Sequence, residues 1–163
     1  MSKLIIGYGN PYRQDDGVAW HILQELSGRL DIPAAAPFEQ GFLPASQPVD
    51  LWSVLQIVPE MAEQIAQYER VCFVDAHTGI VPEDVSVSEV IAEYSSSPLT
   101  HHLTPSALLS ITNALYSVNP RALLVSIRGY EFGFIESLSE RTKKLVPLAT
   151  DRIMSFINSN SDA

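Results

Sequence analysis

The chain has 163 residues, of which 46% are hydrophobic and 18% charged, a composition typical of one globular domain with a proper core. Ten Lys and Arg against nineteen Asp and Glu give a formal net charge of −9, which repels phosphate backbones and argues against a nucleic-acid partner. A single cysteine excludes a disulfide framework and any multi-cysteine zinc or iron–sulfur site made by this chain alone. No apolar run approaches the roughly 20 residues of a membrane span. The first residues lack the features of a secretory signal, so we expect residues 1–163 to form a single cytoplasmic domain away from membranes.

The amino-terminal third begins with a buried strand. Lys3 to Tyr8 is a short apolar run stopped by glycine-rich turn residues, which favours a strand over a helix. Asp15 or Asp16 can cap the helix that follows, and Gly28 is expected to end it. Residues 31–50 contain four prolines and no clear period, which predicts mostly loop with one short extended piece.

The rest of the chain alternates strands with helices. The hydrophobic patterns predict strands at residues 51–58, 71–74, 85–92 and 122–127. Helices are expected from Pro59 to about Tyr68, from a Thr104 cap with Pro105 in the first turn, and from Ser139 to Ile157 with a kink at Pro147. This alternation predicts an α/β fold, a three-layer α/β/α sandwich around a mostly parallel, twisted central sheet.

Three side chains with metal-binding chemistry stand at element boundaries. In open α/β sheets, ligands bind beyond the carboxyl ends of the strands. Asp16 follows the first strand, Asp75 ends the strand near residue 71, and His101 precedes the helix that begins near Thr104. Carboxylate oxygen and imidazole nitrogen together suit zinc, nickel or iron. The separations, 59 residues and then 26, are dictated by the fold and form no compact motif.

Other interpretations of these residues stay open. Asp15 or Asp16 could simply cap the first helix, and Asp75 could be a turn residue at a strand end. Gly7 and Gly9 after a strand suggest a dinucleotide site, but Tyr12 stands where that fingerprint has its third glycine. Cys72 lies inside an apolar strand and is interpreted as a small buried hydrophobe, not a nucleophile.

Several segments carry a resemblance to a known family. They are Ile5-Ile6-Gly7-Tyr8-Gly9-Asn10 followed by Asp15-Asp16-Gly17-Val18, the segment 56–63, Val74-Asp75-Ala76, and His101-His102-Leu103-Thr104-Pro105. In this order they resemble the motifs of the hydrogenase maturation proteases, whose start reads Gly-x-Gly-Asn and then Asp-[Asp/Glu]-Gly-[Val/Ile]-Gly. Ala19 departs from that pattern, which commonly has glycine there. The similarity covers most of the chain and is weakest over residues 31–50.

The resemblance implies an endopeptidase that recognises nickel in the precursor of a [NiFe]-hydrogenase large subunit and removes its C-terminal extension. It implies metal ligation by Asp16, Asp75 and His101, catalysis by Asp16 and Asp75, and a substrate-binding loop at Gly7, Gly9 and Asn10. The nickel arrives with the precursor, so we expect a monomer with no tightly held metal of its own.

The reaction route and two other functions stay open at this point. Nickel could polarise the scissile carbonyl or activate water, or it could only dock the substrate while Asp16 or Asp75 acts as general base. A nickel-binding or sensing module without hydrolysis would use the same ligands. A small-nucleotide-binding domain is the other alternative.

Overall fold

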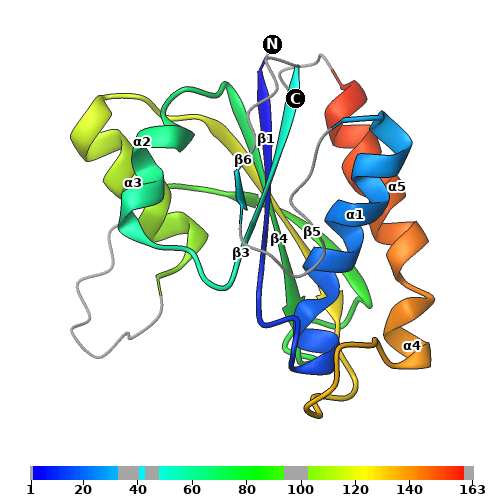
Figure 1. The fold of residues 1–163 in the computed structure, drawn as a ribbon. Coiled ribbons are helices and arrows are strands. Elements are labelled where there is room, and N and C mark those ends of the chain that lie inside the picture. The colour runs from blue at the N-terminus through cyan, green and yellow to red at the C-terminus, as the bar shows by residue number, and fades with distance from the viewer. Residues whose placement is uncertain (1, 33–40, 43–47, 94–102, 160–163) are drawn as a thin grey trace.

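A six-stranded sheet forms the middle layer of the computed structural model, which describes residues 2–32, 41–42, 48–93 and 103–159 (Figure 1). The strands lie in the order β2-β3-β1-β4-β6-β5. Neighbours among β3, β1, β4 and β6 run parallel, whereas the edge strands β2 and β5 are antiparallel to their neighbours. Their bounds are β1 Lys3–Tyr8, β2 Gly41–Phe42, β3 Val49–Val54, β4 Arg70–His77, β5 Val85–Val90 and β6 Arg121–Arg128. The predicted mostly parallel sheet is confirmed.

Helices cover both faces of this sheet (Figure 1). The helices α1 (Val18–Leu30) and α5 (Val146–Asn158) lie on one face, and α2 (Ala62–Ile65) and α3 (Pro105–Tyr116) lie on the other. The short helix α4 (Glu140–Lys143) precedes α5, and two 3₁₀ helices, η1 (Gln14–Gly17) and η2 (Pro59–Met61), precede α1 and α2. The predicted three-layer α/β/α fold is therefore confirmed. Within the described ranges, every helix is too short or too polar to cross a bilayer.

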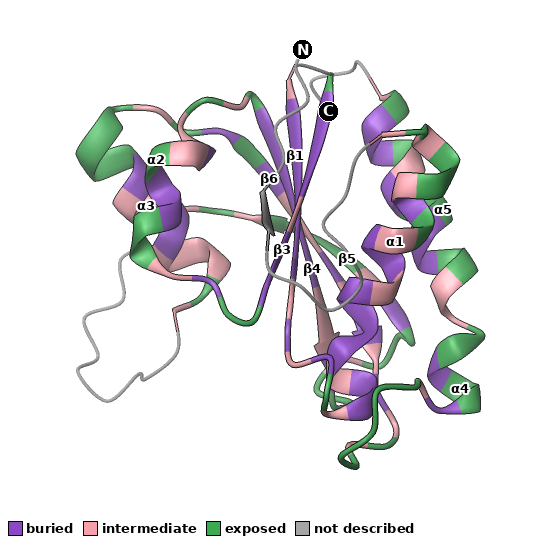
Figure 2. Cartoon of the chain, viewed as in Figure 1, coloured by how far each residue is buried: buried purple, intermediate pink, exposed green. Residues whose placement is uncertain are grey.

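Each face of the sheet has its own apolar core (Figure 2). Successive side chains of a strand point to opposite faces, so Ile5 packs with α1 and α5 residues while Leu4 and Ile6 pack with α2 and α3 residues. Burial on both faces explains why β1 and β4 read as continuous apolar runs and not as alternating ones. Cys72 is fully buried, as predicted, in the core on the α1 and α5 face, and burial raises the pKa of its thiol to about 12.

The first helix differs from its prediction at both ends. Gly28 was expected to end it, but α1 continues to Leu30 and stops at Asp31, whose φ of 51° is left-handed. Leu30 packs against the core, and this contact offsets the cost of a glycine inside a helix, about 1 kcal/mol. The expected aspartate cap is also wrong, because the residue before α1 is Gly17, which has no capping side chain.

The carboxyl-terminal helix is two helices. The helix expected to begin at Ser139 begins at Glu140, because Ser139 is the cap of α4 and accepts a hydrogen bond from the Thr142 N–H at 3.3 Å. Pro147 does not kink a continuous helix, because it occupies the first turn of α5, where no N–H has a helical partner. The Thr104 cap is confirmed by a 3.1 Å bond from the Ala107 N–H.

Several predicted boundaries shift by a few residues. The strand expected at 51–58 is β3, which ends at Val54, and the strand expected at 85–92 ends at Val90. The helix expected from Pro59 starts there as η2, and α2 ends at Ile65, short of Tyr68. The extended piece expected within 31–50 corresponds to β2, while residues 33–40 and 43–47 lie outside the described residues.

Candidate active site

The carboxyl ends of β1 and β4 bring two predicted site residues together. Gly7 pairs with Val74 across the parallel strands, so the next residues, Tyr8 and Asp75, lie at neighbouring positions near the carboxyl ends of their strands. Asp75 was predicted to end its strand, but β4 continues for two more residues to His77. The chain then turns from β1 into η1, which carries Asp16. Asp16 lies close enough that its charge raises the pKa of Asp75. Two carboxyl groups 59 residues apart thus share this edge.

Asp75 has an unusual protonation equilibrium. Burial is the main cause that raises the pKa of its carboxyl to about 7, and the charge of Asp16 adds to this effect. Hydrogen bonds from the Ala76 N–H, at 2.7 Å, and from the Tyr8 hydroxyl oppose the rise only in part. Asp75 can therefore take up and release a proton near neutral pH.

Tyr8 is a site residue that sequence reasoning missed, because it occupied the variable position of the glycine motif. Burial and the neighbouring Asp75 raise the pKa of its phenol, so the hydroxyl stays protonated and donates to Asp75. The signal that could have found it is its place as the last residue of a strand next to the one that ends near Asp75.

Asn10 shapes the loop that presents Asp16. The Asn10 N–H donates to the Asp16 carboxylate at 2.8 Å, and the Asn10 side-chain oxygen accepts from the Tyr12 N–H at 2.9 Å. The Arg13 N–H donates to the Asn10 carbonyl at 3.1 Å. Asparagine favours such turns because its short side chain bonds to nearby backbone. Asn10 thus positions Asp16, and a direct role in substrate binding stays a prediction.

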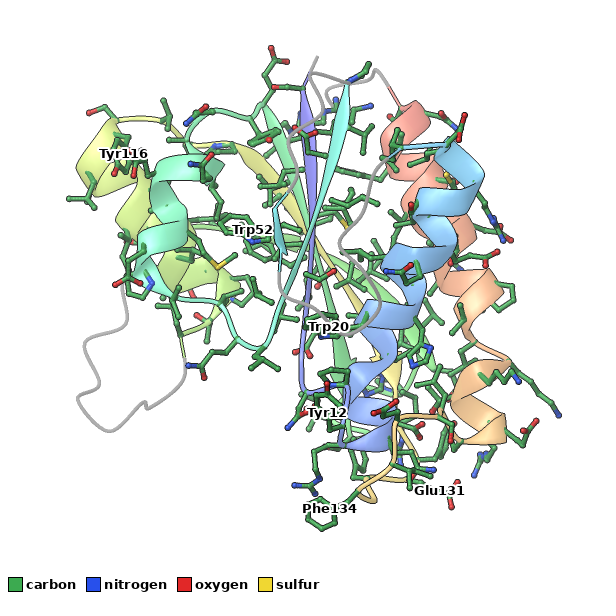
Figure 3. The ribbon with its side chains drawn as sticks, in the orientation of Figure 1. Tyr12, Trp20, Trp52, Tyr116, Glu131 and Phe134 are labelled. Carbon is green, nitrogen blue, oxygen red and sulfur yellow. The ribbon has the colours of Figure 1, made fainter. Side chains whose placement is uncertain are left out.

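Two glycines allow close backbone packing in this loop. Gly9 has φ of 136°, and a Cβ atom there would lie 2.1 Å from the Asp16 carbonyl oxygen. Trp20 holds Gly9 from the other side, because its indole N–H donates to the Gly9 carbonyl at 2.8 Å (Figure 3). At Gly7 a Cβ atom would lie 2.9 Å from a methyl group of Leu23 on α1.

Asp15 is a fully buried structural carboxylate. It accepts hydrogen bonds from the backbone N–H groups of Tyr130, Glu131 and Ser139 at 2.8 to 2.9 Å, and from the hydroxyls of Ser139 and Thr142 at 2.7 and 2.8 Å. Burial by itself raises the pKa of Asp15, but the bonds from Ser139, Tyr130 and Glu131 outweigh it and hold the pKa below its usual value. Asp15 therefore ties η1 to the loop after β6.

The third predicted ligand, His101, lies outside the described residues, as does His102. In the described part of the chain, no three His, Cys, Asp or Glu side chains are grouped to hold a metal. His77 is not a free donor, because its ring nitrogens bond to the Gly79 N–H at 3.1 Å and the Glu83 carbonyl at 3.0 Å. Asp16 and Asp75 thus provide two oxygen donors, and the imidazole stays a prediction.

No family model and no curated protein matches the sequence, whereas solved structures do. The fold is that of peptidases that mature [NiFe] hydrogenases, the family that the sequence motifs resemble. HybD from Thermococcus kodakarensis is similar over 97% of this chain and 100% of its own, with 17% identity and a TM-score of 0.67. HybD from E. coli is similar over 96% of this chain and 92% of its own, with 14% identity and a TM-score of 0.70. HycI from Thermococcus kodakarensis KOD1 is similar over 97% of this chain and 93% of its own, with 18% identity and a TM-score of 0.65.

Replacing Gly9 by alanine should destabilise the protein by about 2–4 kcal/mol, because the new Cβ atom meets the Asp16 carbonyl and the left-handed backbone is strained. Gly28→Ala is the matched control, since nothing lies within 4 Å of its added Cβ atom and alanine favours the helix. Urea unfolding of both variants measures the difference. Equal stability of Gly9→Ala and the parent would contradict the close contact.

Asp15→Asn should lower the free energy of unfolding by about 2–4 kcal/mol at pH 7, because charge-assisted hydrogen bonds are lost in a buried site. The folded pKa of Asp15 lies below the unfolded value of 3.8. The carboxylate's contribution is therefore complete above that value and is lost as the pH falls below it. Urea unfolding from pH 7 to 3 should show the difference between parent and variant shrinking below about pH 4. A difference independent of pH would contradict this role.

Proposed function

We propose that this chain is an endopeptidase that recognises nickel in the precursor of a [NiFe]-hydrogenase large subunit and removes its C-terminal extension in the cytoplasm. One observation carries the proposal: Asp16, in η1 after β1, and Asp75, near the carboxyl end of β4, are distant in sequence, yet the charge of Asp16 raises the pKa of Asp75. The fold shared with hydrogenase maturation proteases supports it.

In this proposal Asp16, Asp75 and His101 bind the nickel that the precursor already carries. Carboxylate oxygens and an imidazole nitrogen are suitable ligands for that ion, and a three-ligand site leaves a position for the substrate. If nickel only docks the substrate, Asp75 is the general base for an attacking water, because burial raises the pKa of its metal-free carboxyl to about 7. The Asp16 carboxylate already accepts the Asn10 N–H, which orients it toward the same edge.

The glycine loop argues against a nucleotide site. The space beside Gly9, where a phosphate would approach the backbone, is occupied by the Asp16 carbonyl. Asp16 and Asp75 at the same edge would repel a phosphate group. A nickel-binding module without hydrolysis would bind the same ion, and it differs from a peptidase in leaving the precursor intact.

Asp16→Asn, Asp75→Asn and His101→Ala should each slow processing of a nickel-loaded precursor from the same organism by about 100-fold or more, because Asn lacks the carboxylate charge that holds a divalent ion and Ala lacks the imidazole donor. His102→Ala is the control, since the motif register assigns the ligand to His101, and loss of activity in His102→Ala alone would shift that register by one residue. Gel-shift analysis of the shortened product measures the rate. Full activity of Asp75→Asn would refute the site. If the parent protein leaves the precursor intact, the peptidase is excluded and the nickel-binding module without hydrolysis is favoured.

The purified protein should fold without bound metal, because the ion belongs to the precursor and the protein needs only modest affinity for it. EDTA should change the melting temperature by less than about 2 °C, since a ligand that is absent contributes nothing to stability. Added nickel or zinc should bind weakly, and Asp75→Asn should abolish this binding in calorimetry. Stoichiometric metal that survives purification, with unfolding on chelation, would contradict the prediction.

A further inference from the structure

The loop Gly129–Ser139, between β6 and α4, exposes apolar side chains at the same end of the molecule as the acid pair. Phe134 is 84% exposed and the adjacent Ile135 is 51% exposed. Figure 3 shows Phe134 projecting from this end, on the side where Tyr12 of the first loop lies. Because they are exposed to water, this aromatic and this β-branched side chain add no hydrophobic stabilisation to the fold of this chain.

This loop is held firmly along its length. Besides the three N–H groups that donate to Asp15, the Gly133 N–H donates to the Gln14 side chain at 3.0 Å. In the other direction, the Gln14 N–H donates to the Ile135 carbonyl at 2.9 Å and the Asp15 N–H donates to the Glu131 carbonyl at 3.1 Å. The backbone on both sides of Phe134 is therefore fixed to the segment that precedes Asp16.

Arg13 supports the exposed ring directly. Its guanidinium carbon lies 4.6 Å from the centre of the Phe134 ring, and its Nε and Nη2 groups donate to the Phe132 carbonyl at 3.3 and 3.1 Å. The hydrogen bonds of the Arg13 guanidinium within the described residues go to a backbone carbonyl and not to a carboxylate. A stacked guanidinium of this kind keeps its positive charge available to a carbonyl or carboxylate of a partner.

We propose that Arg13, Phe134 and Ile135 form a docking surface for the polypeptide precursor, with an apolar side chain of the precursor on Phe134 and Ile135 and a backbone or carboxylate oxygen at Arg13. The inference rests on the proposed function. Its support is continuity with the candidate site: Arg13 is three residues from Asp16, and the loop is bonded to the segment between them. Because the backbone is already ordered, binding costs little conformational entropy.

The test uses three variants. One is a double variant that carries both Phe134→Ser and Ile135→Ser, the second is Arg13→Gln, and the third, Leu115→Ser, is the control. Leu115 is 66% exposed on α3, across the sheet from α1 and α5. With nickel-loaded precursor as the probe, the double variant should raise KM about tenfold and leave kcat within about twofold, and Arg13→Gln should raise KM in the same direction. Leu115→Ser should match the parent. Melting temperatures within about 2 °C of the parent show that the variants fold.

Binding of the precursor to immobilised protein, measured without regard to cleavage, separates this inference from the proposed function. Parent protein that binds but does not cleave, with binding lost in the double variant, would overturn the peptidase and support the docking surface. Cleavage with an unchanged KM in the double variant would overturn the docking surface alone. A parent protein that neither binds nor cleaves the precursor would overturn both.

Discussion

The arrangement of the active edge depends on one buried carboxylate. Asp15 has no contact with water, and its two oxygens accept five hydrogen bonds from three residues of the 129–139 loop and one of α4. A buried charge is tolerated only when such donors replace its hydration. The next residue in the chain is Asp16, so the bonds that satisfy Asp15 also fix where the neighbouring carboxylate projects.

Like charge and burial make the edge receptive to a cation. Asp16 and Asp75 repel one another, and part of this energy appears as the raised pKa of Asp75. A divalent ion placed between two carboxylates removes the repulsion and adds attraction. In the proposed function, a nickel-bearing precursor would relieve this repulsion and an empty precursor would not, which would favour recognition of the loaded form.

Much of the fold was predictable because its signals are local. The apolar runs that became β1 and β4, the Thr104 cap and the Ser139 cap each depend on residues within a few positions. Asp15 was misread as a helix cap because its donors lie 115 to 127 positions away, where no local pattern reaches. Tyr8 was missed for the same reason, since its role depends on the register between β1 and β4. Asp16 and Asp75 could be placed on one edge from the sequence because Asp16 lies in the connection after β1 and Asp75 lies near the carboxyl end of β4.

The sequence distance between Asp15 and its partners has a consequence for synthesis. Thr142 follows Asp15 by 127 positions, so the carboxylate gains its full set of donors only after residue 142 has left the ribosome. Until then Asp15 is a charge that lacks these bonds, and the segment that carries Asp16 is not tied to the loop after β6. A chain cut before residue 139 would therefore lack this anchor of the edge. In the proposed function, the peptidase could not act on a partner before this part of its fold had formed.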